Sequence, residues 1–392
     1  MSRTYDYRPY DASTDRDRCA QIISHSFGTP PESCVRWLVS AGHLFRVLTD
    51  GPVVVGTVLL YDIGQFFGGK SVPMMGVAGV TVAPEARGRG VGGEIMRQCV
   101  LEMHELGAPI STLYPATQKL YQSVGFEQAG SRFCYRLPTD AILERDTTLN
   151  VSPFVDADMP SVRELYASFA APLPGFVNRD DMMWQRVLMP HGDPAHAFVT
   201  TNAMGTIQGF TVLMQRSAHD HYRTLELSDV VYATPAAARR LLRFFRDHSS
   251  TVRHIVFHGG PHHPLVLLLE EQRYEVMRKD YWMTRILDVP KAIAARGYAK
   301  GLTAQVDIEL TDTLIPSNAR RWTIEINRGS GTATAGGRGS VKLDVRNLAP
   351  IYTGFVPPLS LKSLGLIEGD DELLRTLGDI FAGQSPAMVE QF

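Results

Sequence analysis

The sequence predicts a mixed α+β protein in three parts: two tandem halves of strands and helices, and an α+β C-terminal part. Three observations predict this fold. An apolar, β-branched run over 77–82 meets a glycine-rich turn, after which apolar residues recur at one-face helical spacing. A similar order of strands and helices recurs over 151–287. Beyond 288, alternating strands precede helices, as in an α+β layer.

Composition narrows the class of protein. The 392 residues suggest two to three domains, and 44% hydrophobic with 20% charged residues is typical of a globular protein. A net charge of -2 gives no general attraction to nucleic acid or to an anionic membrane. No apolar run approaches the roughly 18 residues of a spanning helix, and the polar N-terminus is not a signal peptide. Four cysteines without CxxC spacing read as reduced thiols. We therefore expect a cytoplasmic protein that binds neither nucleic acid nor membrane.

The first half is predicted to open with a strand at Tyr5 and Tyr7. Helices are then predicted over 15–27 and 32–41, and strands over 44–49 and 53–61 around an Asp-Gly-Pro turn, a hairpin signal. The chain from 66 to 75 leads into the apolar strand over 77–82. Pro84 ends that strand, because proline cannot donate to a strand ladder.

A glycine-rich turn, Arg87-Gly88-Arg89-Gly90-Val91-Gly92-Gly93, connects this strand to a helix. The unpaired N–H groups and positive dipole end of a helix N-terminus attract an anion, and glycines let a phosphate approach the backbone. The glycine spacing is not Gly-x-Gly-x-x-Gly, and no Gly-Lys-Ser/Thr completes a P-loop. The Arg-x-x-Gly-x-Gly pattern after Val-Ala-Pro resembles the pyrophosphate loop of the GCN5-related N-acetyltransferases, which bind acetyl-coenzyme A.

A second landmark of that family follows the predicted strand over 109–114. The segment Leu120-Tyr121-Gln122-Ser123-Val124-Gly125-Phe126 reads as a short helix with a C-capping glycine, and the last strand covers 133–136. In the family, the tyrosine hydroxyl here lies near the coenzyme sulfur and protonates the departing thiolate. The alternative is that Tyr121 only packs, with its ring buried. The two roles are compatible.

The second half follows a linker over 138–150. Helices are predicted over 157–169, 184–188, 236–248 and 264–272, and strands over 197–200, 207–214, 225–233, 253–258 and 276–286. Where the first half has its glycine-rich turn, this half has Thr234-Pro235 followed by alanines and arginines. No glycine admits a phosphate there. The second half is therefore predicted to be a degenerate acetyltransferase fold, which leaves one catalytic site per chain.

The C-terminal part alternates strands before it becomes helical. Strands are predicted over 304–310, 322–327 and 341–345, with a glycine-rich stretch over 329–339 between the last two. Helices are predicted over 348–353, 359–364 and 371–381, and the chain closes on Phe392.

As a whole, the chain resembles the Eis (enhanced intracellular survival) family of GCN5-related N-acetyltransferases. The resemblance implies an N-terminal GNAT domain over 1–137, a degenerate GNAT-like domain over 151–287 and a sterol-carrier-protein-like domain over 288–392. Family members are hexamers that acetylate primary amines, including several amino groups of aminoglycosides. Their C-terminal carboxylate is threaded into the active site of the first domain.

The resemblance also implies roles for individual residues. Tyr121 would be the general acid and the α-carboxylate of Phe392 the anchor for the ammonium or the base. An α-carboxyl group has a reference pKa of about 3.5, so anchoring comes first and proton removal second. The acetyl-CoA site would comprise Val80, Thr81, Val82, Arg87, Gly88, Arg89, Gly90, Val91, Gly92, Gly93, Ala116 and Thr117. The amine would be lined by Phe27, Glu32 and Trp37, although core packing is the default for Trp37.

Two alternatives stay open at this point. The acceptor could be a polyamine, lysine or another small-metabolite amine. The chain could instead be a non-catalytic ligand- or lipid-binding regulatory protein, against which the intact glycine-rich loop and Tyr121 argue. Two weaker patterns favour a structural role over a functional one. The histidines at 254, 258, 262 and 263 indicate a capped turn more than a metal site. The arginine stripe over 239–246 indicates a solvated or subunit-contact face.

Overall fold

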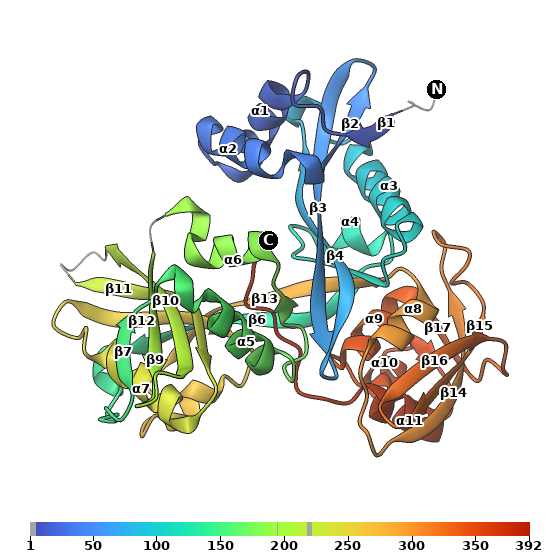
Figure 1. Cartoon of the computed structure of the whole chain (residues 1–392). Helices are drawn as coiled ribbons and strands as arrows, with labels where there is room; N and C mark the ends of the chain where they lie inside the picture. The colour runs from blue at the N-terminus through green and yellow to red at the C-terminus, as the bar shows by residue number, and fades with distance from the viewer. Residues whose placement is uncertain (1–4, 194, 218–221) are drawn as a thin grey trace.

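The structure is a computed structural model (Figure 1) that describes residues 5–193, 195–217 and 222–392. Within these residues the strands form one sheet of 13 strands and one of five. The larger sheet takes its strands from residues 6–286, and the smaller sheet lies in the C-terminal part. The predicted mixed α and β fold is confirmed.

The first half contains the elements that the periodicity predicts, with small differences at their ends. In chain order these are β1 (Asp6–Pro9), α1 (Arg16–Phe27), α2 (Pro31–Ala41), η1 (Gly42–Leu44), β2 (Phe45–Asp50), β3 (Val53–Phe67), β4 (Lys70–Val82), η2 (Pro84–Ala86), α3 (Val91–Glu105), β5 (Ile110–Leu113), α4 (Gln118–Gln122), β6 (Glu127–Pro138) and η3 (Thr139–Ala141).

The β3–β4 hairpin is longer than predicted. Its strands have 15 and 13 residues, whereas a typical strand has about 5–6. The hairpin reaches the C-terminal part of the chain, where the Gly297 N–H donates to the Phe67 carbonyl at 3.1 Å. A Cβ at Gly68 would lie 1.9 Å from the Gly297 carbonyl oxygen, so glycine is required at this close approach. The hairpin therefore ties the first half to the C-terminal part (Figure 1).

The second half repeats the order of the first. Its elements are β7 (Asn150–Pro153), η4 (Asp156–Asp158), α5 (Met159–Ala170), β8 (Val177–Asn178), α6 (Asp181–Leu188), η5 (Pro190–Gly192), β9 (His196–Thr201), β10 (Ile207–Ser217), β11 (Arg223–Tyr232), α7 (Pro235–Arg246), β12 (Val252–Gly259), η6 (Pro264–Leu268) and β13 (Glu275–Ile286). The predicted helix over 264–272 is wrong: only the 3-10 helix η6 forms, and residues 269–274 form neither helix nor strand.

The two halves exchange their last strands within the larger sheet. The strand order is β1-β2-β3-β4-β5-β13-β6-β12-β11-β10-β9-β7, with β8 paired to β3. Strand β13 of the second half therefore pairs with β5 of the first, and β6 of the first half pairs with β12 of the second. Trp282 on β13 is fully buried at this junction. The sequence pattern did not predict this exchange.

The C-terminal part forms the smaller sheet with helices packed on it. Its elements are α8 (Val289–Ala295), β14 (Thr303–Thr311), β15 (Arg321–Asn327), β16 (Ser330–Ala335), β17 (Val341–Asp344), α9 (Val345–Thr353), α10 (Pro358–Ser363), β18 (Ile367–Glu368) and α11 (Asp371–Phe381). Strand β16 was not predicted, because its polar sequence lacks apolar alternation; it pairs with β15 inside the stretch read as a glycine-rich connection.

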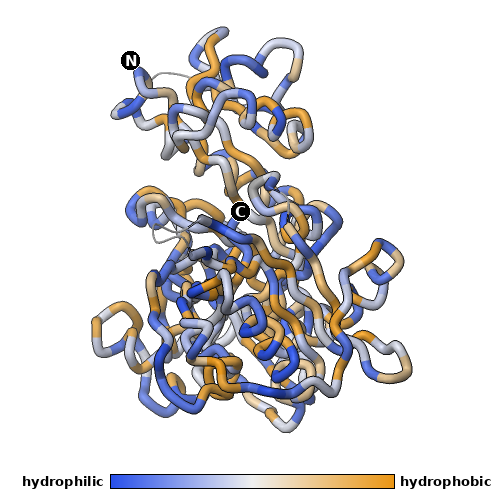
Figure 2. Tube along the Cα trace, turned by 90° about the vertical axis from the view of Figure 1, so that its left-hand side faces the viewer, coloured by the Kyte–Doolittle hydropathy of each residue, from blue (hydrophilic) through white to orange (hydrophobic). Residues whose placement is uncertain are grey.

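The chain ends at the centre of the molecule. After α11 it passes between the two halves, and the C-terminus lies between α6 and the long hairpin (Figure 1). Figure 2, turned by 90° from Figure 1, also shows the C-terminus near the middle of the molecule. Among the described helices, none combines the length and apolar character needed to cross a membrane.

Candidate active site

Strands β4 and β5 pair over only the first part of their shared edge. They pair in parallel only from Met74 opposite Ile110 to Val77 opposite Leu113. Residues 78–82 continue β4 and pair with β3 alone among the described strands. The other edge of β4 therefore offers backbone N–H and C=O groups, which need partners when they are removed from water.

A β-bulge lies in this free stretch of β4. Thr57 pairs with Thr81 and Leu59 with Ala78, so Gly79 and Val80 together oppose one residue of β3. Gly79 has φ +57°, and a Cβ there would lie 3.2 Å from the Trp37 ring. The Thr57 hydroxyl donates to the Gly79 carbonyl at 2.9 Å. The bulge thus has a fixed conformation that sets the direction of the following backbone groups.

The glycine-rich loop forms an open cradle at the start of α3. Gly88 and Gly90 have φ of +76° and +80°, and Gly90 is the N-cap residue. A Cβ at Gly88, Gly90 or Gly93 would meet no atom within 4 Å, which leaves room for a phosphate against the backbone. Arg87 and Arg89 are exposed beside it. The loop thus has the shape, dipole and charge that a pyrophosphate requires.

Helix α4 borders this cradle. Gly92 lies against it, since a Cβ there would be 3.6 Å from the Leu120 side chain. Ala116 and Thr117 are exposed between β5 and α4, where they can line a ligand held by the loop.

Tyr121 lies in α4 with its ring buried. The ring packs edge-on to Phe126 with 6.3 Å between centroids, and Gly125, with φ +90°, lies in the turn that follows the helix. Burial, with a smaller contribution from the Cys99 thiol, raises the pKa of Tyr121 to about 12. No described residue forms a hydrogen bond with its hydroxyl. The hydroxyl therefore keeps its proton at neutral pH and has it free to donate.

The terminal residue lies on the long hairpin where β4 and β5 begin to separate. The Phe392 ring covers Gly76, because a Cβ at Gly76 would lie 2.8 Å from a ring carbon. It also packs edge-on to Tyr61, with 5.8 Å between centroids. Tyr61 and Gly76 pair across the hairpin, and Gly76 immediately precedes the last pair of β4 with β5.

Polar groups from both halves hold the tail that leads to Phe392. Tyr114 donates from its hydroxyl to the Met388 carbonyl at 2.9 Å, and Arg132 donates from Nε to the Val389 carbonyl at 2.9 Å. Arg186 of α6 donates from Nη2 to the Gln391 carbonyl at 2.9 Å and from Nη1 to the Tyr61 hydroxyl at 3.2 Å. The path of the tail is therefore fixed up to its last residue.

A buried ion cluster fixes the tail further back. The guanidinium of Arg179 forms two hydrogen bonds with Asp229, at 2.6 and 3.1 Å, and one with Glu390 at 2.6 Å. It lies 3.7 Å from the centroid of the Tyr166 ring. Burial alone would lower the pKa of Arg179, but Asp229, Tyr166 and Glu390 raise it well above its ordinary value. The side chains of Arg179, Asp229 and Glu390 are 1%, 5% and 8% exposed, so breaking this cluster leaves a buried charge unpaired.

The corresponding groove of the second half is filled. Strands β11 and β12 separate after Glu226 opposite Val256, and a bulge at Ser228 interrupts the pairing of β11 with β10. The space between them is about 30 Å³ and is lined in part by Val389 of the tail. That volume suits about one water molecule and no coenzyme. The Thr234 hydroxyl also caps α7 by accepting from the Ala237 N–H at 3.1 Å, where a phosphate would need free donors.

The predicted acceptor residues do not all gather at the site. Trp37 contacts the bulge and packs edge-on to Phe45 at 5.1 Å, so it lies next to the free stretch of β4. Phe27, by contrast, is 54% exposed at the end of α1, and Glu32 is exposed in the first turn of α2.

His263 of the histidine cluster and two arginines of the stripe over 239–246 have structural contacts. His263 is buried, and its Nδ1 accepts from the Leu265 N–H at 3.3 Å, so it caps η6 as a turn residue. No group of three metal-ligating side chains occurs within the described ranges. Arg239 pairs with Glu144 at 2.7 Å, and Arg240 donates to the Leu149 carbonyl at 2.9 Å, so part of the arginine stripe contacts the linker.

The groups that hold the tail could not be predicted from the residues alone. Arg179, Arg186 and Tyr61 lie more than 200 residues from the tail in sequence and carry no motif. The sequence nevertheless contained two signals. One is Tyr61 within an apolar strand. The other is the pair Arg179 and Arg186 on either side of Trp184, in the half that is predicted to bind no coenzyme.

Comparison with known proteins matches these observations. Two acetyltransferase (GNAT) domain models match residues 6–129 and 175–286, and a sterol carrier protein domain model matches 289–389. A GCN5-related N-acetyltransferase from Anabaena variabilis is 30% identical, with 99% of this chain and 100% of that chain covered and a TM-score of 0.95. One from Kribbella flavida is 29% identical, with 100% and 99% covered and a TM-score of 0.88.

The N-acetyltransferase Eis of Mycobacterium tuberculosis is 25% identical to this chain over 91% of each. The separated strands, the glycine-rich loop and the domain matches define the class of protein, an N-acetyltransferase of the GCN5-related type with an added sterol carrier protein domain. The chain belongs to the GCN5-related N-acetyltransferases, and it is Eis-like over nearly its whole length.

Proposed function

We propose that the first half transfers an acetyl group from acetyl-CoA to a primary amine by direct attack in a ternary complex. The observation that carries this proposal is the position of the terminal residue. Phe392 lies on the pair formed by Tyr61 and Gly76, directly before the point where β4 leaves β5. A carboxylate at the end of that residue can meet an amine that approaches the open edge of β4.

The residues present fit acetyl-CoA. Backbone groups of Val80, Thr81 and Val82 would bind the pantetheine arm and the thioester carbonyl, because this edge of β4 has no strand partner among the described residues. The loop over 87–93 would hold the pyrophosphate, and Ala116 and Thr117 would line the far side. Acetyl-CoA supplies the activated acetyl thioester; the protein supplies position and charge.

Tyr121 would act as the proton donor to the leaving sulfur. Its pKa of about 12 keeps it protonated. A cysteine-like thiol has a pKa of about 8.5, so full transfer from the tyrosine is uphill by roughly 5 kcal/mol. A hydrogen bond that strengthens as the C–S bond breaks is therefore the form of catalysis that suits this residue.

The α-carboxylate of Phe392 would act first as an anchor for the ammonium. It forms no ion pair with any described lysine, arginine or histidine, so its charge is available to a ligand. As a base it is weak, since the gap of about 7 pKa units to an alkylamine corresponds to roughly 9 kcal/mol. Proton removal would therefore proceed through a water molecule or through the shift that burial gives the carboxylate.

Arginines near the tail favour acceptors with few positive charges. Arg132 and Arg186 both donate to backbone groups within three residues of the terminus, and the acidic neighbour Glu390 is already paired with Arg179. A polycationic aminoglycoside would meet the charge of Arg186, whereas the charge of Arg132 is offset in part by Asp280 at 4.0 Å. Lysine or another small-metabolite amine therefore suits the site better than an aminoglycoside or a polyamine.

The test measures coenzyme A release with a thiol reagent for a monoamine, lysine, spermidine and an aminoglycoside. We expect turnover with at least one amine, and a loss of at least about tenfold when Phe392 is deleted, with acetyl-CoA binding retained. Gln384→Ala, an exposed change in the same tail, is the control and should keep full activity. Tight acetyl-CoA binding without turnover of any amine would favour a non-catalytic ligand-binding protein.

Three further expectations rest on family resemblance alone. We propose a homo-hexamer, a cytoplasmic location and the domain limits 1–137, 151–287 and 288–392. The strand exchange bears on the last of these, because a cut at 137 separates β6 from its partners β12 and β13. Sedimentation of the purified protein tests the assembly directly.

A further inference from the structure

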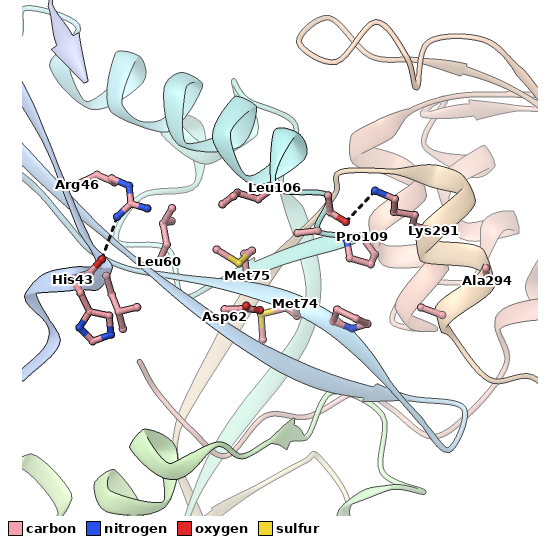
Figure 3. Close-up of a pocket in the computed structure, with 15 residues that line it drawn as sticks. His43, Arg46, Leu60, Asp62, Met74, Met75, Leu106, Pro109, Lys291 and Ala294 are labelled. Carbon is pink, nitrogen blue, oxygen red and sulfur yellow. Dashed lines mark hydrogen bonds between the residues drawn. The ribbon is translucent and has the colours of Figure 1, made fainter. Parts of the chain in front are cut away.

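A cavity of about 710 Å³ lies between the first half and the C-terminal part (Figure 3). Its walls come from β2, β3 and β4, from the turn after α3, and from α8. The volume falls within the range of about 300–1,000 Å³ that small-molecule sites occupy, and such sites often lie where two domains meet.

This cavity is on the opposite face of the hairpin from the proposed active site. Tyr61 and Gly76 face Phe392, whereas Asp62 and Met75, the next pair, line the cavity. Neighbouring residues of a strand point to opposite faces of the sheet. The cavity also lies near the C-terminal end of α3, a helix of 15 residues and so about 22 Å long, while the glycine-rich loop is at its N-terminal end.

Most of the wall is apolar. Leu60 and Met75 come from the hairpin, Pro109 from the turn before β5, and Ala294 and Ala295 from α8 (Figure 3). Leu106, the residue that follows α3, lines the cavity and is 63% exposed. An apolar ligand body would cover this leucine, and burying apolar surface favours binding.

Two of the charged groups in the cavity already have partners. Arg46 donates from Nε to Glu102 at 2.7 Å and from Nη1 to two backbone carbonyls. Lys291 lies 3.5 Å from a carboxylate oxygen of Asp288 and donates to the Gly107 carbonyl at 3.2 Å. The imidazole of His43 is exposed at the opening. Arg46 and Lys291 therefore present no free positive charge to a ligand.

Asp62 is different. It is an exposed residue in the interior of β3, where its neighbours on both sides are buried. Its carboxylate forms no hydrogen bond or ion pair with any described residue. Figure 3 shows it beside the methionines of β4 at the floor of the cavity. An unpaired anion against apolar walls is complementary to a cation that carries an apolar body.

We propose that this cavity binds a small amphipathic organic cation, with its ammonium beside Asp62 and its apolar part against Met75, Leu106 and α8. The proposal stands apart from acetyl transfer, because it uses none of the groups assigned to that reaction. A ligand here would contact both the first half and the C-terminal part, and would stabilise their association by its binding free energy.

The test uses three probes with the same alkyl chain: octyltrimethylammonium, octanol and octanoate. The quaternary ammonium has no N–H, so the enzyme cannot acetylate it. Titrations at pH 8, where histidine side chains are mainly uncharged, follow methyl-labelled methionines by NMR in the full-length protein. We expect saturable binding of the cation with shifts centred on Met74 and Met75, and binding of the other two probes weaker by about fivefold or more.

Variants assign the effect to the carboxylate. Asp62→Asn should weaken binding of the cation by about fivefold and bring it to the level of octanol. Asp156→Asn, an exposed carboxylate of the second half, should behave as the natural protein does. Both variants should keep acetyl transfer and the thermal midpoint. Equal or tighter binding of octanoate, no effect of Asp62→Asn, shifts at other methionines, or no saturable binding would each overturn the proposal.

Discussion

At the scale of single residues, the hydroxyl of Tyr121 can be separated from its ring. Tyr121→Phe keeps the packing against Phe126 and removes only the proton donor. We expect kcat to fall by about 10²-fold, the lower end for general acid catalysis, while the KM for acetyl-CoA stays the same. Tyr222→Phe, at an exposed position, is the control. An unchanged kcat for Tyr121→Phe would restrict this tyrosine to packing.

Arg186 is a positioning residue, because it holds the peptide before Phe392 and does not itself reach the reacting atoms. Arg186→Gln should lower kcat/KM by about tenfold, as a misplaced group does. The deciding measurement is a double-mutant cycle. If Arg186 acts through the terminal residue, the same change adds less than about twofold in the protein that lacks Phe392. Arg163→Gln on α5 is the matched control, and additive losses would exclude the positioning role.

At the scale of elements, His263 ties η6 to buried aromatic residues of β6 and β12. Its ring packs edge-on to Phe257 with 4.8 Å between centroids, and its Nδ1 caps the turn. Burial lowers the pKa of His263 to about 4. In the unfolded chain the pKa is near 6.5, so between pH 6.5 and 4 the unfolded state binds more protons and stability falls as the pH falls.

The corresponding variant is His263→Asn, which keeps an acceptor for the cap but cannot be protonated. Between pH 8 and pH 5 the free energy of unfolding of the natural protein should fall by about 2 kcal/mol more than that of the variant. Urea unfolding at the two pH values measures the difference. His196→Asn, at an exposed position on β9, serves as the control. Parallel pH dependence of the His263 variant and the natural protein would contradict the burial argument.

Local patterns predicted most elements because their signals are local. Helices such as α3 and α11 have apolar faces that are visible in a window of a dozen residues. The failures have local causes too. Strand β16 reads Ser-Gly-Thr-Ala-Thr-Ala and has no apolar alternation, while the helix expected after Pro264 ends as the 3-10 helix η6 before the polar residues that follow.

The site itself was only partly predictable. The glycine-rich loop and Tyr121 are short motifs, so their chemistry could be read along the chain. The position of Phe392 came from family resemblance, since nothing in a terminal Glu-Gln-Phe says where it folds. Arg179, Arg186 and Tyr61 act only because the tail passes them, and a contact between residues more than 200 positions apart carries no periodic signal.

At the scale of the whole molecule, the exchange of β6 and β13 joins the two halves into one cooperative unit. Each half contributes a strand to the other, so neither can lose its last strand without exposing a core that both share. The tail reinforces this junction, because the Ser131 N–H on β6 donates to the Pro386 carbonyl at 3.1 Å. We therefore expect the two halves to unfold together.

Gly130→Ala tests this coupling at one atom. A Cβ at Gly130 of β6 would lie 1.9 Å from the Trp282 ring on β13, a clash with a fully buried side chain that cannot move away. We expect a loss of about 2–4 kcal/mol in the free energy of unfolding, and faster hydrogen exchange in β4 and β5 as well as in β11 and β12. Gly301→Ala, where an added Cβ meets no atom within 4 Å, is the matched control. Faster hydrogen exchange in only one half would mean that the two halves unfold independently, although β6 and β13 connect them.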